Sequence, residues 1–383
     1  MKRILLLFSL ALALHSCDST PSAFRRPDVI EQQLSAMTLR EKVGQLFCVR
    51  PEAFDVALSW ETYEQVASYQ LQEVTPQMQK VNAEYPVGGI ILFAHNIDNP
   101  DQLDTLVKHL KAFNGSPLLY IDEEGGRVAR IGNNDNFQVK KYASMGAIGK
   151  TGDPANAYEC GFSIGTYLKR YGLDVDLAPV ADVNTNPSNP VIGTRAFSSD
   201  PELAARMVVQ YLKGLEKAGV AGCVKHFPGH GDTRTDSHFG YASSGKTWEE
   251  MLGCEMIPFK AAIKNGVPMV MTAHIGTPAI TGSNVPATVS PVLLTEKLRK
   301  ELGFNGVIIT DGMSMGAITR QYTPAEATLL SLQAGADIIL GPKDYIPAFE
   351  AVMNAVVRDS TLTEARIDES VRRILTLKAR IRE

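Results

Sequence analysis

Three of the chain's seven histidines fall in one short run, Lys225-His226-Phe227-Pro228-Gly229-His230-Gly231-Asp232-Thr233-Arg234-Thr235-Asp236-Ser237-His238. Asp236 and His238 stand two residues apart, so the carboxylate can hydrogen-bond the imidazole within a tight loop. A carboxylate in that place fixes the tautomer of the ring and raises its basicity. The run therefore indicates acid/base chemistry, with His238 carrying the proton and Asp236 orienting it.

The same histidines could instead ligate a metal ion. Pro228 and Gly229 separate His226 from His230, however, so the two rings cannot share one helical face. No glutamate stands in an H-E-x-x-H context either. A third interpretation is a mobile loop rich in glycine and proline, which is compatible with acid/base chemistry. The sequence thus favours acid/base chemistry and predicts neither a metal nor a cofactor.

Asp311 is a second candidate for chemistry. It ends the apolar run Val307–Thr310 and is followed by uncharged residues. A carboxylate in this place either attacks a substrate carbon or supports a neighbouring cation. Lys225, Arg130 and Arg195 are cations that would hold it ionised, as a nucleophile requires.

Several other apolar runs also end in polar groups. Asp122-Glu123-Glu124 follows one run, Lys225-His226 closes another, and Asp182 and His274 lie near the ends of two more. Any one of them could be a solvated loop charge or a structural ion. Together they indicate an active site, because barrel enzymes carry function at the carboxyl ends of their strands.

Eight short apolar runs are predicted to be the strands that position these groups: Gly44–Val49, Gly88–Phe93, Leu118–Asp122, Asp176–Val183, Ala221–His226, Met269–Ile275, Val307–Asp311 and Ala336–Leu340. The runs are continuous rather than alternating, which is typical of strands covered by helices on both faces. Helical patterns lie between them and after them: Leu103–Phe113, Asn156–Tyr171, Pro201–Ala218, Trp248–Asn265, Pro291–Leu302, Pro324–Ala334 and Thr363–Arg380. This order predicts an α/β fold, a single-domain (β/α)8 barrel. An open nucleotide-binding sheet is less favoured, because no G-x-G-x-x-G follows a strand.

Composition limits the class of protein. The chain has 383 residues, 44% of them apolar and 21% charged, which excludes intrinsic disorder. Its net charge of -4 and the lack of a dense basic patch argue against nucleic acid as a partner. Five cysteines in a chain of this length do not make a disulfide scaffold, and Cys48 and Cys223 in apolar runs are predicted to be buried thiols.

The amino terminus predicts export. Lys2 and Arg3 precede an apolar run from Ile4 to Leu14, which is too short to span a membrane at ~20 residues per span and is typical of a secretory signal. The following Cys17 makes the end of the run similar to the lipobox of bacterial lipoproteins. We therefore expect a signal peptide over residues 1–16, lipidation of Cys17 and a tether over residues 17–28. A catalytic domain over residues 29–383 would then be anchored to a membrane, in the periplasm or at the cell surface.

Together these residues resemble glycoside hydrolase family 3, in particular its β-N-acetylglucosaminidase branch. The most specific element is Lys225–Gly231 followed by Asp236-Ser237-His238, with Ile121–Val128 and Gly193–Pro201 in support. The resemblance begins near Met37 and extends to the closing helix. It implies a monomeric, retaining exo-β-N-acetylglucosaminidase, a β-N-acetylhexosaminidase. Such an enzyme removes terminal non-reducing β-linked N-acetylglucosamine, here from peptidoglycan fragments or other glycans.

The resemblance also implies a role for each residue of the motifs. Asp311 matches the catalytic nucleophile, His238 the general acid/base and Asp236 its orienting carboxylate. Asp122 matches the carboxylate that binds sugar hydroxyls. The subsite for the N-acetylglucosamine ring is matched by Arg130, Arg195, Lys225 and His226. Glu123 is a departure, since glutamine is expected there in many relatives, and it is expected to add a negative charge beside Asp122.

Other functions stay open at this point. A β-glucosidase of the same family normally takes its acid/base glutamate from a second domain, which this chain lacks room for. A phosphorylase is possible because a neutral imidazole does not repel phosphate. A carboxylate base would repel phosphate, and one pair of charges at ~4 Å and an effective dielectric of ~20 has an interaction energy of about 4 kcal/mol. A glycan-binding lipoprotein without catalysis and a metal-dependent hydrolase are the alternatives from other classes.

Overall fold

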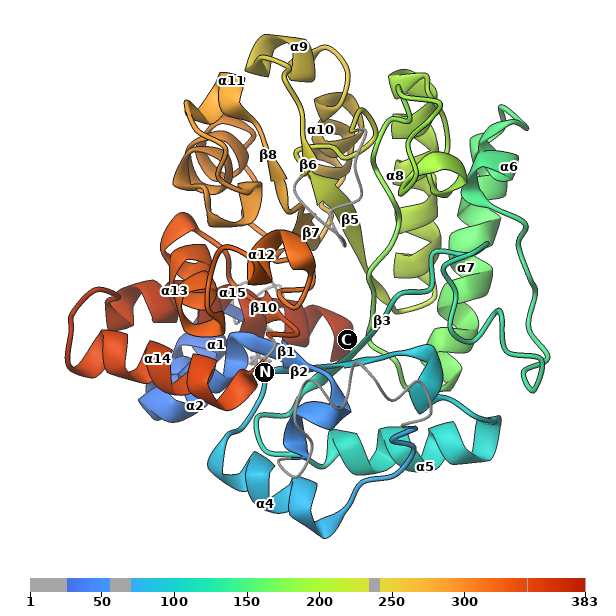
Figure 1. The fold of residues 1–383 in the computed structure, drawn as a ribbon. Helices are drawn as coiled ribbons and strands as arrows, with labels where there is room; N and C mark the ends of the chain where they lie inside the picture. The colour runs from blue at the N-terminus through green and yellow to red at the C-terminus, as the bar shows by residue number, and fades with distance from the viewer. Residues whose placement is uncertain (1–25, 56–69, 234–241, 343, 383) are drawn as a thin grey trace, which may run out of the picture.

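Eight parallel strands form a closed ring at the centre of the molecule (Figure 1). The computed structural model describes residues 26–55, 70–233, 242–342 and 344–382. Around the ring the order is β10-β1-β2-β3-β4-β5-β7-β9, and a parallel bridge between Ile309 and Ile338 closes it. The strands are β1 (Phe47–Val49), β2 (Gly89–Leu92), β3 (Leu118–Ile121), β4 (Val175–Asp176), β5 (Ala221–Phe227), β7 (Met269–Thr272), β9 (Val307–Ile309) and β10 (Ile339–Leu340). The predicted (β/α)8 barrel is confirmed.

Helices surround the strands on the outside (Figure 1). Those of eight residues or more are α1 (Arg26–Ala36), α4 (Pro76–Glu84), α5 (Pro100–Lys111), α7 (Pro154–Arg170), α8 (Pro201–Lys217), α10 (Met256–Lys264), η6 (Val292–Glu301), α13 (Pro324–Ala334), α14 (Tyr345–Val357) and α15 (Glu364–Arg382). The shorter helices are α2 (Leu39–Gln45), η2 (Pro51–Phe54), η3 (Ala94–Asn96), α6 (Met145–Gly149), η4 (Gly193–Arg195), α9 (Trp248–Leu252), α11 (Pro278–Thr281), η5 (Ala287–Val289) and α12 (Gly316–Thr319). Two further strands, β6 (Ala242–Ser243) and β8 (Ile275–Gly276), pair beside the ring. The strands of the ring are buried, and Cys48 and Cys223 are buried thiols as predicted.

Several predicted boundaries differ from the structure. The strand predicted from Gly44 begins at Phe47, because a capping box between Thr38 and Glu41 starts α2. The fourth strand has two residues instead of eight, and its pairing with β5 resumes only as a single bridge between Val180 and Lys225. The helix predicted over 248–265 is two helices, since Pro258 is tolerated only in the first turn of α10.

The last helix, α15, lies across the amino-terminal mouth of the barrel. Its Lys378 Nζ donates to Gln45 Oε1 and to the carbonyl oxygens of Gly115 and Ser116, just before β1 and β3. Its Arg373 pairs with Asp337, just before β10. α15 therefore covers the part of this mouth beside β1, β3 and β10. Among the residues that the structure describes, no helix is long and apolar enough to cross a membrane.

Candidate active site

A pocket of about 220 Å³ opens at the carboxyl ends of the strands. All six predicted site residues in the described part of the chain line it, namely Asp122, Arg130, Arg195, Lys225, His226 and Asp311. Asp236, His238 and Cys17 lie outside the described residues. The structure thus brings together in one cavity residues that are up to 189 positions apart in the chain, since 311 − 122 = 189.

Lys225, from the end of β5, is the centre of a buried charge network. Its Nζ lies 2.8 Å from Asp122 Oδ1 and 2.6 Å from Glu124 Oε1. Burial by itself would lower the pKa of the Lys225 ammonium, but Asp122 and Glu124 hold it above its ordinary value. The ammonium is therefore charged near neutral pH and fixes the Asp122 carboxylate at the pocket wall.

Glu124 also forms a bidentate ion pair with Arg195, which lies in η4. Arg195 Nε lies 2.8 Å from Glu124 Oε2 and Nη2 lies 2.7 Å from Oε1. Burial alone would raise the pKa of the Glu124 carboxyl, but Arg195 and Lys225 outweigh it and hold that pKa well below its usual range. Glu124 was not among the predicted site residues, although it lines the pocket and orients two of them.

His226 is oriented by Asp182. Its Nδ1 lies 2.7 Å from Asp182 Oδ2, while Arg195 Nη2 lies 3.3 Å from its Nε2. Because the carboxylate accepts and the guanidinium donates, the network assigns the proton to Nδ1 and leaves Nε2 as an acceptor. Asp182 was noted only as a polar residue near a strand end, and its partnership with His226 was not predicted.

Glu123 points away from the pocket, contrary to the expectation from the sequence. Its carboxylate accepts hydrogen bonds from the backbone N–H groups of Arg130 (2.6 Å), Ile131 (3.0 Å) and Gly132 (2.7 Å), and from Tyr167 Oη (2.8 Å). The Glu123 carboxylate therefore does not add a charge to the pocket beside Asp122. It binds the backbone of the loop that carries Arg130 and fixes that loop. Arg130 in turn reaches Asp122, with Nη2 3.3 Å from Oδ2.

Asp311 lies two residues after the end of β9, whereas the predicted strand ran on to Asp311 itself. Its Oδ1 accepts from the backbone N–H of Gly312 at 2.7 Å. In the order of the ring, β9 stands four strands away from β3, so Asp311 and Asp122 face each other across the barrel. Arg50, Phe93, Ser314 and Met315 complete the neighbouring walls without having been predicted. The pocket thus has the Asp311 carboxylate on one side, and on the other Asp122 with its ion-pair partners Lys225 and Arg130, a set of charges able to bind hydroxyl groups.

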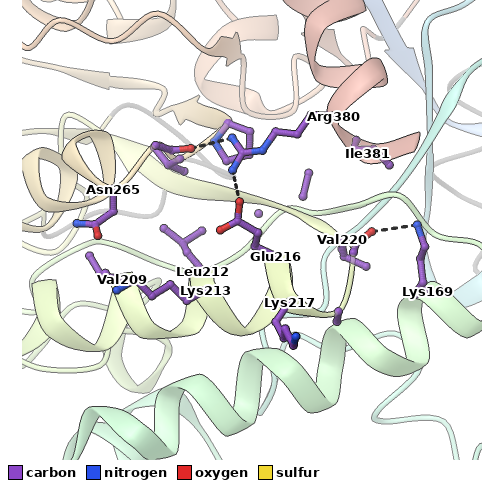
Figure 2. Close-up of a pocket in the computed structure, with 17 residues that line it drawn as sticks. Lys169, Val209, Leu212, Lys213, Glu216, Lys217, Val220, Asn265, Arg380 and Ile381 are labelled. Atoms are coloured by element: carbon purple, nitrogen blue, oxygen red, sulfur yellow. Dashed lines mark hydrogen bonds and ion pairs between the residues drawn. The ribbon is translucent and has the colours of Figure 1, made fainter. Parts of the chain in front are cut away.

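A larger hollow of about 400 Å³ lies at the amino-terminal mouth, between α8 and the end of α15 (Figure 2). Its one carboxylate, Glu216, pairs with Arg380. The pocket at the carboxyl ends of the strands has two carboxylates on opposite walls, Asp122 and Asp311, and this hollow has no such pair. We therefore place the chemistry at the carboxyl ends of the strands. Of the residues that the structure describes, no three His, Cys, Asp or Glu side chains gather as a metal site.

Comparison with known proteins identifies the family of the chain. The sequence model of the glycosyl hydrolase family 3 N terminal domain matches residues 38–377. A β-hexosaminidase A from Pseudoalteromonas piscicida is 35% identical over 331 residues, which are 80% of this chain and 55% of the relative. A β-hexosaminidase from Tolumonas auensis is 35% identical over 273 residues, 70% of this chain and 79% of the relative.

A solved structure is also similar. It is a glycoside hydrolase family 3 β-N-acetylglucosaminidase from Paenibacillus sp. str. FPU-7, with a TM-score of 0.82 and 37% identity. The match covers 91% of this chain and 63% of that protein. The chain thus spans just over half of the first of these relatives and under two thirds of the solved one. The chain belongs to glycoside hydrolase family 3.

Proposed function

We propose that the chain is a retaining exo-β-N-acetylglucosaminidase that removes terminal non-reducing β-linked N-acetylglucosamine. The observation that carries this proposal is the position of Asp311 opposite Asp122, in a pocket of sugar size. A carboxylate across from a charged group that binds hydroxyls suits attack at the anomeric carbon of a bound sugar ring. The relatives named β-hexosaminidase and β-N-acetylglucosaminidase support N-acetylglucosamine as that sugar.

The proposed reaction has two steps. Asp311 attacks the anomeric carbon while His238, as imidazolium, gives a proton to the leaving oxygen, and a covalent glycosyl-enzyme forms. The neutral imidazole then takes a proton from water, whose oxygen displaces Asp311 from the sugar. An imidazole has an ordinary pKa of ~6.5, so it can serve both steps near neutral pH. Asp236 would orient the ring and stabilise its charged form.

The pocket walls would bind the sugar in both steps. Asp122 would accept hydrogen bonds from hydroxyls, and its ion pairs with Lys225 and Arg130 keep it ionised. Arg195, Lys225 and Arg130 would donate to ring substituents. His226 has its Nδ1 held by Asp182, so its ring orientation is set before substrate arrives. Binding would therefore require little rearrangement of these side chains.

The test is release of 4-nitrophenol by the purified protein from the β-N-acetylglucosaminide and from the β-glucoside, with and without phosphate. We expect the acetylglucosaminide to be cleaved much faster, with free N-acetylglucosamine as product. Preference for the glucoside would instead indicate a β-glucosidase, and accumulation of sugar 1-phosphate a phosphorylase. Folded protein that cleaves neither would contradict the proposal and favour a glycan-binding role. Loss of activity on adding a chelator would favour a metal-dependent hydrolase.

The site of action is also proposed. Export and lipidation at Cys17 would place the domain outside the cytoplasm, where peptidoglycan fragments or other glycans are its substrates. Membrane fractionation of cells expressing the full chain tests this, with Cys17→Ala as the control. We expect the protein in the membrane fraction and the variant outside it. Equal distribution of the two would contradict lipidation.

A further inference from the structure

We propose that Glu123 is a positioning residue, which places Arg130 against Asp122 and so sets how tightly the pocket binds a sugar ring. The inference rests on the proposed function, because it takes Asp122 and Arg130 as sugar-binding groups. Glu123 is fully buried, and its carboxylate lies behind the pocket wall. It therefore acts on a ligand only through the residues that it bonds.

Arg130 is held less firmly by its own side chain than the neighbouring Arg195. Arg195 makes two hydrogen bonds to Glu124, at 2.8 and 2.7 Å. Arg130 makes a single one to Asp122, from Nη2 to Oδ2 at 3.3 Å, and its buried Nε has no hydrogen-bond partner among the described residues. The Arg130 guanidinium also lies over the ring of Phe93, 5.4 Å from the ring centre. Its position therefore depends on the backbone that carries it.

The Glu123 carboxylate holds that backbone. Its Oε2 accepts from the backbone N–H groups of Arg130 at 2.6 Å and Ile131 at 3.0 Å. Its Oε1 accepts from the N–H of Gly132 at 2.7 Å and from Tyr167 Oη, on α7, at 2.8 Å. A Cβ atom on Gly132 would lie 2.9 Å from Oε1, so the loop approaches the carboxylate closely. Hydrogen bonds to a charged acceptor are roughly twice as strong as neutral ones, so this carboxylate is a firm anchor for the loop.

The main chain of Glu123 fixes the other member of the pair. Asp122 is the preceding residue, and the N–H of the peptide between them donates to Asp176 Oδ1, at the end of β4, at 3.0 Å. Tyr211 Oη, on α8, donates to the carbonyl oxygen of Glu123 at 3.3 Å. Glu123 is thus connected to Asp122 through its backbone and to Arg130 through its side chain.

The proposed nucleophile is held separately from this pair. Asp311 lies after β9, four strands from β3 in the ring, and its Oδ1 accepts from the N–H of Gly312. A displaced Arg130 would therefore weaken binding of the sugar ring and leave the attacking carboxylate in place. Loss of an interaction that is equal in the ground state and the transition state raises KM without changing kcat.

The test is Glu123→Ala in the full chain. The affinity for N-acetylglucosamine is measured by titration calorimetry, and turnover is measured on the 4-nitrophenyl β-N-acetylglucosaminide. We expect the dissociation constant to rise about 10-fold, as for loss of one hydrogen bond to a charged group. KM should rise by a similar factor, while kcat should change by less than about 3-fold.

Glu123→Gln is the conservative variant. Its amide oxygen can still accept from the N–H groups of Arg130 and Ile131, and the Tyr167 hydroxyl can turn to accept from the amide NH2. Only the acceptor for Gly132 is lost. We expect this variant to recover most of the affinity, to within about 3-fold of the wild type.

A double-mutant cycle with Arg130→Met shows whether Glu123 acts through Arg130. If it does, Glu123→Ala should weaken binding no further once Arg130→Met is present, because the positioned group is already gone. If Glu123→Ala does not fold, as judged by thermal unfolding, Glu123→Gln takes its place in the cycle, and its smaller loss should vanish in the same background. Losses that multiply in the cycle would show that Glu123 acts by another route and would overturn the inference.

Asp174→Ala is the matched control. Asp174 also accepts from a backbone N–H of β3, with Oδ2 2.9 Å from Leu119 N, and it pairs with Lys111. It lies just before β4, at the opposite end of these strands from the pocket. Its loss should lower the temperature of thermal unfolding and leave the dissociation constant of N-acetylglucosamine unchanged. An equal loss of affinity in Asp174→Ala and Glu123→Ala would make the role of Glu123 only structural, and the inference would fail.

Asp122→Asn, measured in parallel, separates this inference from the proposed function. If Asp122→Asn weakens binding of N-acetylglucosamine but Glu123→Ala does not, the sugar site stands and the positioning role of Glu123 is refuted. If Asp122→Asn leaves the affinity unchanged, or the wild type binds no N-acetylglucosamine, the pocket is not the sugar site and the proposed function fails first.

Discussion

His274, just after the neighbouring strand β7, holds the backbone beside Asp311. Its Nε2 lies 2.9 Å from Gly312 O and its Nδ1 lies 2.8 Å from Thr288 Oγ1. Because a carbonyl oxygen only accepts, His274 Nε2 carries the proton of the bond to Gly312 O. The fully buried ring therefore fixes the peptide that follows Asp311.

Removal of this ring should affect catalysis more than binding. We expect His274→Ala to lower kcat by about 10-fold, the equivalent of one buried hydrogen bond of about 1.4 kcal/mol, with KM nearly unchanged. His274→Gln can still donate an N–H to Gly312 O and should recover part of the loss. Steady-state kinetics on an aryl glycoside measure both. Equal kcat in the alanine variant and the wild type would show that this contact does not position Asp311.

Asp311→Ala should abolish turnover and leave folding intact. Without the nucleophile no glycosyl-enzyme can form, so we expect a loss of at least about 1,000-fold. Mass spectrometry of protein quenched during turnover of a slow substrate should show one sugar attached to the peptide that contains Asp311. Asp359→Ala, at an exposed position, is the control and should keep both the adduct and the rate. An adduct that persists in Asp311→Ala would assign the nucleophile elsewhere.

The buried ammonium of Lys225 should matter for stability as well as for binding. Lys225→Met leaves Asp122 and Glu124 side by side without the cation they share, and Glu124 is buried. Breaking a buried ion pair in this way typically costs about 3–5 kcal/mol. We expect a decrease of that order in the free energy of unfolding, measured with denaturant.

An exposed lysine provides the matched comparison. Lys300 pairs with Glu296 on the surface of η6, and its side chain is 66% exposed against 3% for Lys225. A surface pair of this kind contributes about 0.5 kcal/mol or less. If Lys300→Met and Lys225→Met lowered the free energy of unfolding equally, the network around Lys225 would not be a stabilising one.

Much of the site could be predicted from the polar residues at the ends of individual apolar runs. Asp122 directly follows β3, Lys225 and His226 lie near the carboxyl end of β5, and Asp311 lies two residues after β9. Parallel strands bring such ends to one rim. The pattern carries this information because a strand buried on both faces has no other reason to end in a charge. The predicted family is confirmed by the match to the family model, and the predicted barrel by the ring of parallel strands.

Residues that act through a distant partner could not be predicted in this way. Glu124 bonds Arg195, 71 positions away, and Asp182 bonds His226, 44 positions away. Local pattern does not record such pairings, since they depend on how neighbouring loops pack. Glu123 was misjudged for the same reason, because the direction of its side chain is set by the backbone N–H groups of a loop that turns back towards it.

The free energy of unfolding should decrease as the pH falls below neutrality, because His230 takes up a proton more readily in the unfolded chain than in the folded protein. Burial, reinforced by the neighbouring His226 and opposed by Asp182, lowers the pKa of His230 from its ordinary 6.5. As the pH falls below 6.5, the unfolded chain takes up a proton at this residue before the folded protein does. The free energy of unfolding should therefore decrease with falling pH, by up to about 1.4 kcal/mol per pH unit from this group. We expect His230→Gln to flatten that slope between pH 6.5 and pH 5, and His109→Gln, at an exposed position, to leave it unchanged. A slope that stays the same in His230→Gln would assign the acid sensitivity to other groups.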